Sequence, residues 1–275
     1  MIEQKIVNHN FEEKNIREEN YSAFWIKSFG KGDHIFIECK EKNIFSLNRN
    51  LGASKGDKFI STLKDHSNLV VGFLKNEEYM KIVYYQGNGG VQKIFHDSKK
   101  DPVCMIIKKV NGKGDWLIWL EPLGYNNFLL LNSYQPYFEN QYIFLSNPPN
   151  RHYFKISSDE FNESGSLYMA ILLFRSEYFN VGLYKGNVDF VDTLVKNDLL
   201  LIKNVTNKGN WRLFSSKLNS GNSSFKLNTN SALSENDDQI NVQIKNNFFY
   251  PKKNCNAINN ERDTYVYLSF GEKEK

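Results

Sequence analysis

Apolar and polar residues along most of the chain follow the two-residue alternation of β-strands, and helical periodicity over ten or more residues is hard to find. Three short apolar runs each end in or near a lysine and precede a glycine-rich turn and a second run of alternating bulk. The Asn111–Gly112 pair in the second turn is a strong hairpin signal. We therefore expect three β-hairpins, whose opening runs are Ala23–Lys27, Val103–Lys109 and Leu199–Asn204.

Two of these hairpins align without a gap. The stretch KKVNGKGDWLIW (Lys108–Trp119) and the stretch KNVTNKGNWRLF (Lys203–Phe214) share Lys, Val, Lys, Gly and Trp at matched positions. A shorter version, KSFGKGDHIFI (Lys27–Ile37), has His34 where the other two have Trp. Among the shared positions we assign three to architecture, which are Lys108, Gly114 and Trp116 in one copy and Lys203, Gly209 and Trp211 in the other.

The repetition extends beyond the hairpins. An apolar–x–Leu–Asn element follows each hairpin, and a Tyr-x-Gly-Asn turn precedes two of the three hairpins. Further on comes a closing strand, predicted at Asn68–Leu74, Ser166–Phe174 and Thr264–Phe270. The chain is therefore predicted to be a diverged threefold repeat over 21–80, 81–180 and 181–275, with the first copy degenerate and lacking its leading strand. Residues 1–20 hold few apolar residues and are predicted to form an N-terminal arm that orders against a partner.

The length of the repeat and the parity of its strands indicate the fold. A unit of roughly 90 residues exceeds a solenoid repeat, so we expect an all-β fold of tandem β-sandwich-like repeats, of the jelly-roll or lectin-like kind. In the second hairpin Trp116 and Ile118 share one face of the strand, and Leu117 and Trp119 share the other. Apolar groups on both faces predict a strand covered on both sides, or a strand at a subunit contact.

Composition supports this class and excludes others. An aromatic content of 15% suits pleated, half-buried surfaces. The net charge of +4 is small and Lys and Glu are interleaved, which gives nucleic-acid binding little support. Three scattered cysteines without CxxC spacing predict free thiols and neither a disulfide framework nor a zinc site. The longest apolar run, Leu167–Phe174, is far shorter than the roughly 20 residues of a membrane helix, and the N-terminus lacks the apolar core of a signal peptide. We expect a soluble product made in a cytoplasm.

Catalytic motifs are missing from the sequence. The five histidines are scattered, and the acidic pairs fall in polar stretches typical of solvated loops. No G-x-S-x-G elbow, P-loop or HExxH motif occurs, and no spacing proposes the paired carboxylates of a glycosidase. We therefore predict that the chain is not an enzyme, that it has no catalytic residues, and that it needs no cofactor or metal.

The loops after two of the apolar–x–Leu–Asn elements are rich in Tyr, Asn, Ser and Phe. They span Ser133–Ser158 and Thr229–Pro251. This mixture resembles an adhesive surface, where rigid aromatic area is combined with adaptable hydrogen bonding; the alternative is that both are simply long sandwich loops. The residues predicted to bind a ligand are Asn126, Asn127, Tyr134, Tyr137 and Tyr142.

Taken in order, these elements resemble the repeated β domain of tail-fibre-like proteins of marine bacteriophages. That domain has a Gly-Asn-Gly turn, a Pro-led apolar strand ending in Lys, a Gly-x-Trp strand and a Tyr-rich closing strand. Here the corresponding places are Tyr85–Gly89, Pro102–Lys108, Gly114–Trp116 and Tyr265–Ser269. The first copy departs from the pattern, because it has His34 for Trp and lacks the opening turn.

The resemblance implies a virion structural protein, assembled in the host cytoplasm, that forms part of a tail fibre or fibre-like appendage and contacts the host surface. Its implied partners are further copies of itself as a homotrimer, other phage tail or capsid proteins, and a host-surface glycan or protein. Residues 1–20 would attach it to the virion. The alternatives are a head-attached fibre or capsid decoration protein, a carbohydrate-binding module or lectin, and a polysaccharide depolymerase.

Overall fold

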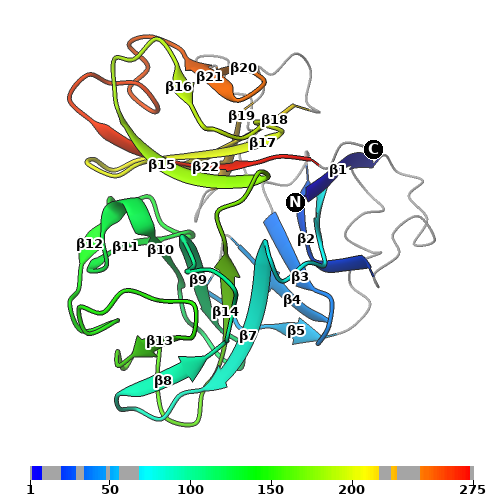
Figure 1. Cartoon of the computed structure of the whole chain (residues 1–275), viewed down its shortest axis with the longest axis vertical. Helices are drawn as coiled ribbons and strands as arrows, with labels where there is room; N and C mark the ends of the chain where they lie inside the picture. The colour runs from blue at the N-terminus through cyan, green and yellow to red at the C-terminus, as the bar shows by residue number, and fades with distance from the viewer. Residues whose placement is uncertain are drawn as a thin grey trace.

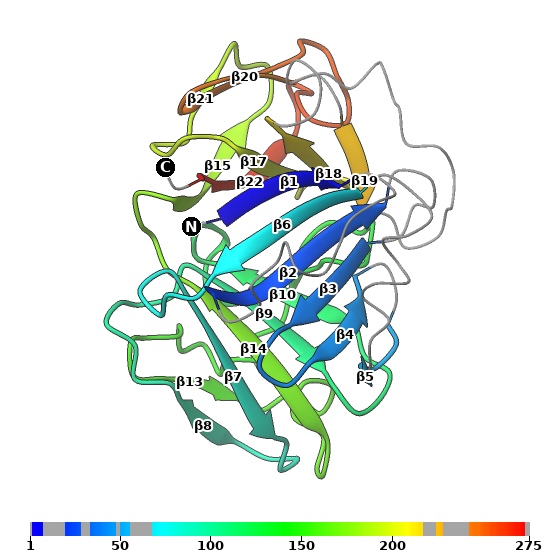
Figure 2. The same cartoon turned by 90° about the vertical axis from the view of Figure 1, so that its right-hand side faces the viewer.

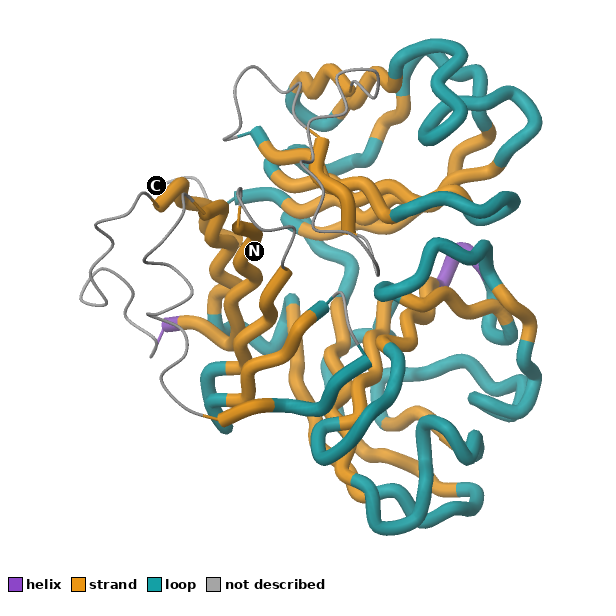
Figure 3. Tube along the Cα trace, turned by 180° about the vertical axis from the view of Figure 1, so that it is seen from behind, coloured by secondary structure: helices purple, strands orange, loops and turns teal. Residues whose placement is uncertain are grey.

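The computed structural model describes residues 2–7, 20–28, 34–47, 50–55, 68–216, 224–227 and 242–272. The fold is all-β, as predicted, and three main sheets stand around one apolar core like the faces of a triangular prism (Figure 1). The view from behind shows the same three groups of strands around a common centre (Figure 3). A single turn of 3-10 helix, η3 (Glu121–Leu123), follows one of the central strands.

Main sheet 1 belongs to the first repeat and is seen face on in Figure 2. Its strands lie in the order β1-β6-β2-β3-β4-β5, and all neighbours are antiparallel. Its strands are β1 (Ile2–Val7), β2 (Tyr21–Ser28), β3 (His34–Glu38), β4 (Asn43–Ser46), β5 (Ser54–Lys55) and β6 (Asn68–Leu74).

Main sheets 2 and 3 repeat this order. Main sheet 2 runs β7-β14-β9-β10-β11-β12, and main sheet 3 runs β15-β22-β17-β18-β19. The strands of main sheet 2 are β7 (Met80–Gln86), β9 (Cys104–Lys109), β10 (Trp116–Leu120), β11 (Asn127–Leu130), β12 (Phe138–Glu139) and β14 (Leu167–Leu173). Those of main sheet 3 are β15 (Phe179–Lys185), β17 (Leu199–Asn204), β18 (Trp211–Ser215), β19 (Ser224–Leu227) and β22 (Thr264–Phe270).

The shared order means that each sheet has a leading strand, a closing strand beside it, and then the predicted hairpin. In main sheet 1 the leading strand is β1, which pairs with β6 as β7 pairs with β14 and β15 with β22. The expectation that the first copy lacks its leading strand, and that its first residues form an arm, is therefore wrong for Ile2–Val7. Gln4 occupies a buried position in this strand, which weakens the apolar alternation that marks the other leading strands. Residues 8–19 of the predicted arm lie outside the described residues.

Two small sheets cover the outer faces of main sheets 2 and 3. We call them lid 2 and lid 3. Lid 2 pairs β8 (Gln92–Phe95) with β13 (Tyr153–Ile156). Lid 3 has the order β16-β21-β20, formed by β16 (Val191–Asp192), β20 (Val242–Lys245) and β21 (Phe248–Pro251). Each lid packs its inner side chains on the main sheet beneath it, so the second and third repeats are two-layered and sandwich-like.

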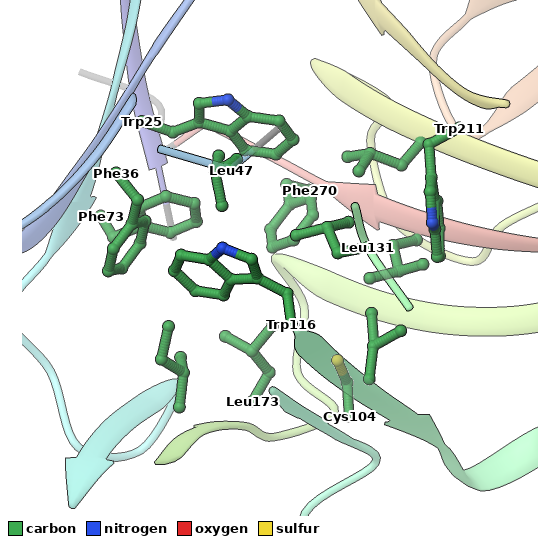
Figure 4. Close-up of a cluster of buried hydrophobic side chains, with 14 of the residues drawn as sticks. Trp25, Phe36, Leu47, Phe73, Cys104, Trp116, Leu131, Leu173, Trp211 and Phe270 are labelled. Carbon is green, nitrogen blue, oxygen red and sulfur yellow. The ribbon is translucent and has the colours of Figure 1, made fainter. Parts of the chain in front are cut away.

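The inner faces of all three main sheets meet in one core (Figure 4). Trp116 lies at its centre, with the ring centres of Phe36 and Phe45 at 6.0 and 5.5 Å in edge-on geometry. Trp25 and Trp211 join the same cluster from the first and third sheets. A cavity of about 50 Å³, lined only by apolar side chains, remains between the sheets. Voids of this kind stay dry, because a water inside would find no polar partner.

The predicted strand parity is confirmed. Trp116 and Ile118 belong to the central core, whereas Leu117 and Trp119 belong to the second core, under lid 2. Their strand is thus covered on both sides within the chain. The two apolar faces, which were also compatible with a subunit contact, are covered by the central core and by lid 2 of the same chain.

The two ends of the chain close the ring of sheets. They lie near each other in Figures 1, 2 and 3, and the backbone N–H of Ile2 donates to the Gly271 carbonyl at 3.3 Å. The buried Gln4 amide donates to the Asp198 carbonyl at 2.8 Å and accepts from the Ser215 hydroxyl. Main sheets 1 and 3 are therefore joined by backbone and side-chain hydrogen bonds, although they are farthest apart in sequence.

Candidate functional site

The recurring Lys, Gly and Trp contact one another in the second and third hairpins, and the same residues bind the preceding repeat. We call this set of contacts the joint. The Lys108 ammonium donates to the Gly114 carbonyl and lies 5.6 Å from the centre of the Trp116 ring. Lys203 donates in the same way to Gly209 and also, at 3.1 Å, to the carbonyl of Tyr134 in the preceding repeat. Both lysines are fully buried, so each ammonium is bound by backbone carbonyls and is closed to solvent.

The same hairpin also forms hydrogen bonds with the preceding repeat. One such set lies at the boundary between repeats one and two. The backbone N–H of Gly114 donates to the Asn50 carbonyl at 2.8 Å. The indole N–H of Trp116 donates to the Ser46 carbonyl at 3.0 Å. Asn50 follows the apolar–x–Leu–Asn element of the first repeat, and Ser46 is the x residue of that element.

The boundary between repeats two and three copies this joint. The Gly209 N–H donates to the Tyr134 carbonyl at 2.8 Å, and the Trp211 indole donates to the Leu130 carbonyl at 3.2 Å. Leu130 is the x residue of the second apolar–x–Leu–Asn element, and Tyr134 stands where Asn50 stands in the first. Identical donors thus meet equivalent acceptors at both boundaries, and the motif serves to connect repeats.

Burial changes the acidity of the two lysines. Removal from water lowers the pKa of Lys108 to about 8, with the nearby Asp115 carboxylate acting in the opposite direction. The same desolvation lowers the pKa of Lys203 to about 7. A lowered lysine pKa is often a sign of a nucleophile or base. Here each amine is buried beneath its hairpin, where no substrate reaches it. We therefore attribute the lowered pKa values to burial in a structural contact.

The Tyr-x-Gly-Asn turns are a second structural feature that the second and third repeats share. Tyr85 stacks on Tyr168 with ring centres 5.2 Å apart, and its hydroxyl donates to the Phe161 carbonyl at 2.7 Å. Tyr184 stacks on Tyr265 at 5.1 Å and donates to the Ile258 carbonyl at 2.5 Å. Burial raises the pKa of both Tyr85 and Tyr184 well above the ordinary value, so both hydroxyls stay protonated donors.

Glycine is required in these turns by close approach of the backbone. A Cβ at Gly87 would lie 2.3 Å from the Glu163 carbonyl oxygen, and one at Gly186 would lie 1.8 Å from that of Asn260. Asn162 and Asn259 hold the two loops through backbone contacts to Asn88 and Val188 at 3.3 and 3.1 Å. The Tyr-x-Gly-Asn turn is therefore a packed structural turn in both repeats.

The five residues predicted to bind a ligand lie on or close to the paired strands β11 and β12. Tyr134 and Tyr137 lie at the boundary with the third repeat, where the backbone of Tyr137 donates to the Val205 carbonyl at 3.4 Å. Asn127 donates to the Leu123 carbonyl and supports the turn after η3. Asn126 and Tyr142 belong to neighbouring loops, and Tyr142 is the most exposed of the three tyrosines at 66%. The role of these residues in binding stays a prediction.

A large concave surface is the groove between the first and second repeats. It encloses about 1040 Å³ between the turn that joins β3 to β4 and the outer edge of β7. The Glu38 carboxylate at its base accepts from the backbone N–H groups of Lys40 and Glu41 at 2.6 and 2.8 Å and from the Tyr84 hydroxyl at 2.8 Å. Asn43 donates to the same hydroxyl at 2.9 Å.

These contacts limit what the groove can do. Glu38 is held by three donors and is 1% exposed, so its carboxylate is an anchor for the turn and lacks access to a substrate. Burial lowers the pKa of His96, another residue that lines the groove, and so favours the neutral form of its imidazole. The groove can offer hydrogen bonds to a polar ligand, and its lining also contains the Glu77–Lys81 ion pair at 3.1 Å.

The described part of the chain offers no cluster of metal-ligating side chains. There, no three His, Cys, Asp or Glu residues lie closely enough together to hold a metal ion. No helix among the same residues is long and apolar enough to cross a membrane.

Comparison with known proteins identifies a family. Residues 74–274 match the family described as "Domain of unknown function (DUF7483)", which is well over half of the chain. The chain belongs to this family. The match begins where β6 ends and covers the second and third repeats, which are the two that carry lids, stacked tyrosines and the Gly-x-Trp joint. No curated protein and no solved structure matches the chain.

Proposed function

We propose that the chain is a structural protein of a bacteriophage virion, part of a tail fibre or fibre-like appendage that contacts the host surface. The observation that carries this proposal is the duplicated joint. The same lysine, glycine and tryptophan make the same contacts at both repeat boundaries, so the most regular residues of the chain build a rigid body. The order of these motifs resembles the repeated β domain of phage tail-fibre-like proteins.

A closed, three-sided fold is suited to a function that depends on surface contacts. The core is shared by three sheets, and hydrogen bonds between β1 and main sheet 3 close the ring, so solvent-facing side chains are held on a stiff support. Weak contacts of such a body gain strength when many copies are displayed together. We infer a binding role without catalysis, in the virion, with other tail or capsid proteins and a host-surface glycan or protein as partners.

The oligomeric state is a separate part of the proposal. A homotrimer would supply polyvalent contact. The two-faced apolar strands do not require it, because the central core and the lids cover both faces. Light scattering of the purified chain should give three times the monomer mass; a monodisperse monomer would contradict the trimer and leave the virion role intact.

Analysis of purified particles tests the virion role. Mass spectrometry of phage particles banded on a density gradient should detect the chain at several copies for each copy of the portal protein. Gold-labelled antibody against the chain should then decorate the tail. Labelling of the head would favour the head-attached or decoration alternative, and recovery of the chain only in the soluble lysate would overturn the proposal.

A further inference from the structure

The outer face of lid 2 combines exposed aromatic rings with unpaired positive charge. Ile94 and Phe154 point inward into the core beneath the lid, so alternation along the two strands turns their neighbours outward. The outward set is Phe95 opposite Tyr153 and Lys93 opposite Lys155.

The rings of this face form a small exposed pad. Phe95 is 62% exposed, and its ring centre lies 5.7 Å from that of Tyr153. Val91, beside the same strand, is 63% exposed. Leaving such side chains in water costs free energy, and contiguous exposed apolar groups on a soluble protein commonly mark a binding surface.

The charge on this face is one-sided. Lys93 and Lys155 lie directly across from each other, and like charges in this position repel. In the described part of the chain neither lysine forms an ion pair, and the Lys93 ammonium lies 4.5 Å from the Tyr153 ring centre. The positive charge is thus placed at the rim of the aromatic pad.

We propose that the outer face of lid 2 binds acidic saccharides, such as the uronic acid units of a surface polysaccharide. The apolar C–H face of a pyranose ring packs against the electron-rich face of an aromatic ring. Its carboxylate relieves the repulsion between the two lysines. A neutral sugar would contact the rings but not neutralise the lysines, and a small anion would do the reverse. The proposal deepens the proposed contact with a host surface and rests on it for its biological setting.

Lid 3 is the matched surface within the same chain. It also shows exposed rings beside a lysine, because Phe190 is 53% exposed, lies 5.6 Å from Phe248, and the Lys245 ammonium lies 5.5 Å from the Tyr250 ring centre. The exposed Asp192 is paired with Phe248 and lies on the same face. That carboxylate disfavours an anionic ligand, so lid 3 serves as the internal control.

Calorimetric titration with two sugar series tests the proposal. The probes are oligouronates prepared from alginate and, at the same length, neutral oligosaccharides from dextran. The intact chain should bind the oligouronates and bind the neutral series at least tenfold more weakly. Phe95→Ala and the pair Lys93→Gln/Lys155→Gln should each weaken oligouronate binding about tenfold, the size expected for a lost stacking or ionic contact.

Control variants distinguish this site from the rest of the surface. Phe190→Ala on lid 3 should leave binding unchanged, as should Lys113→Gln/Lys185→Gln, which removes the same charge elsewhere. Absence of binding by the intact chain, or equal losses in the two lysine pairs, would overturn the proposal. So would binding only to phosphatidylserine vesicles. Since these measurements use the purified chain, a negative result does not bear on its presence in virions, and absence from virions does not bear on sugar binding.

Discussion

In the second and third repeats a lid covers the outer face of the main sheet, and a stacked tyrosine pair ties the leading strand to the closing one. In the described residues of the first repeat neither device is present, and His34 stands where the others have Trp. The inner face is nevertheless built alike in all three, because every sheet contributes to the one central core.

This difference shows that the inner and outer faces of each main sheet are under different packing constraints. The inner face must fit two neighbouring sheets at once, and close-packed interiors tolerate little change in volume. The outer faces of the second and third repeats each pack against their own lid and the loops around it. The family match covers the two repeats in which the structure describes lids and leaves out nearly all of the first. The described residues of the first repeat build the sheet that closes the prism.

The largest expected effect comes from the inner ring position. Trp116→Ala and Trp211→Ala should each lower the free energy of unfolding by about 3–5 kcal/mol, because each removes a fully buried indole and its bond to the preceding repeat. His34→Ala should cost less, about 1–3 kcal/mol, since the lost side chain is smaller. Urea unfolding followed by far-ultraviolet circular dichroism measures all three.

A matched variant sharpens this comparison. Trp116→Phe keeps an aromatic ring and loses the indole donor to Ser46, so it should cost less than Trp116→Ala. If His34→Ala proves as costly as Trp116→Ala, the first repeat depends on this position as much as the second does, and the contrast between them fails.

An intermediate effect is expected from the buried lysines as pH changes. Their pKa values are lowered in the folded chain to about 8 for Lys108 and about 7 for Lys203, so between those values and pH 10.5 the unfolded chain binds more protons. The free energy of unfolding should therefore rise with pH in this window, by at most about 1.4 kcal/mol per pH unit for each lysine. Below pH 7 this contribution is constant.

Lysine-to-methionine variants test the effect. Relative to the parent, Lys203→Met should flatten the rise from about pH 7 upward, and Lys108→Met from about pH 8 upward. The measurement is urea unfolding at pH 6.5–9.0, because unfolded tyrosines, with a pKa of about 10, are then mostly protonated. Parallel curves for parent and variants would show that both amines are as well solvated when folded as when unfolded.

The smallest effect should come from the stacked tyrosines. Tyr85→Phe and Tyr184→Phe each remove one hydroxyl donor and leave a buried carbonyl without it, so each should cost about 1–2 kcal/mol. The two losses should agree within about 0.5 kcal/mol, because the two sites have the same geometry. Thermal and urea unfolding give the comparison, and unequal losses would show that the lids contribute differently to the two repeats.

Much of the fold could be predicted from local pattern. The closing strands Asn68–Leu74 and Thr264–Phe270 are where the sequence places them, and the opposite faces of Trp116 and Trp119 follow from two-residue alternation. The leading strand of the first repeat could not be predicted in this way. Its partner lies far away along the chain and its buried Gln4 is polar, so only the long-range pairing with β6 reveals it.

The candidate binding surfaces show the same limit. The Tyr- and Phe-rich segments were predicted to be adhesive or simply long loops, and the structure builds strands β13 and β21 within them. Alternation in Lys93–Phe95 and Tyr153–Lys155 carries a usable signal, because it places rings and lysines on the side opposite the apolar core residues. It does not reveal that these two stretches pair, since most of the second repeat separates them along the chain.

The sequence by itself determined the class of structure, the hairpins, the threefold repetition and which side of each strand is apolar, because these depend on neighbours within a few residues. The tertiary structure decided that three sheets share one core, that the Gly-x-Trp hairpin binds the repeat before it, and that the first strand closes the ring beside the last repeat. It also decided which aromatic rings remain in water. Those outcomes depend on which distant surfaces fit and exclude water together, and no local pattern records that fit.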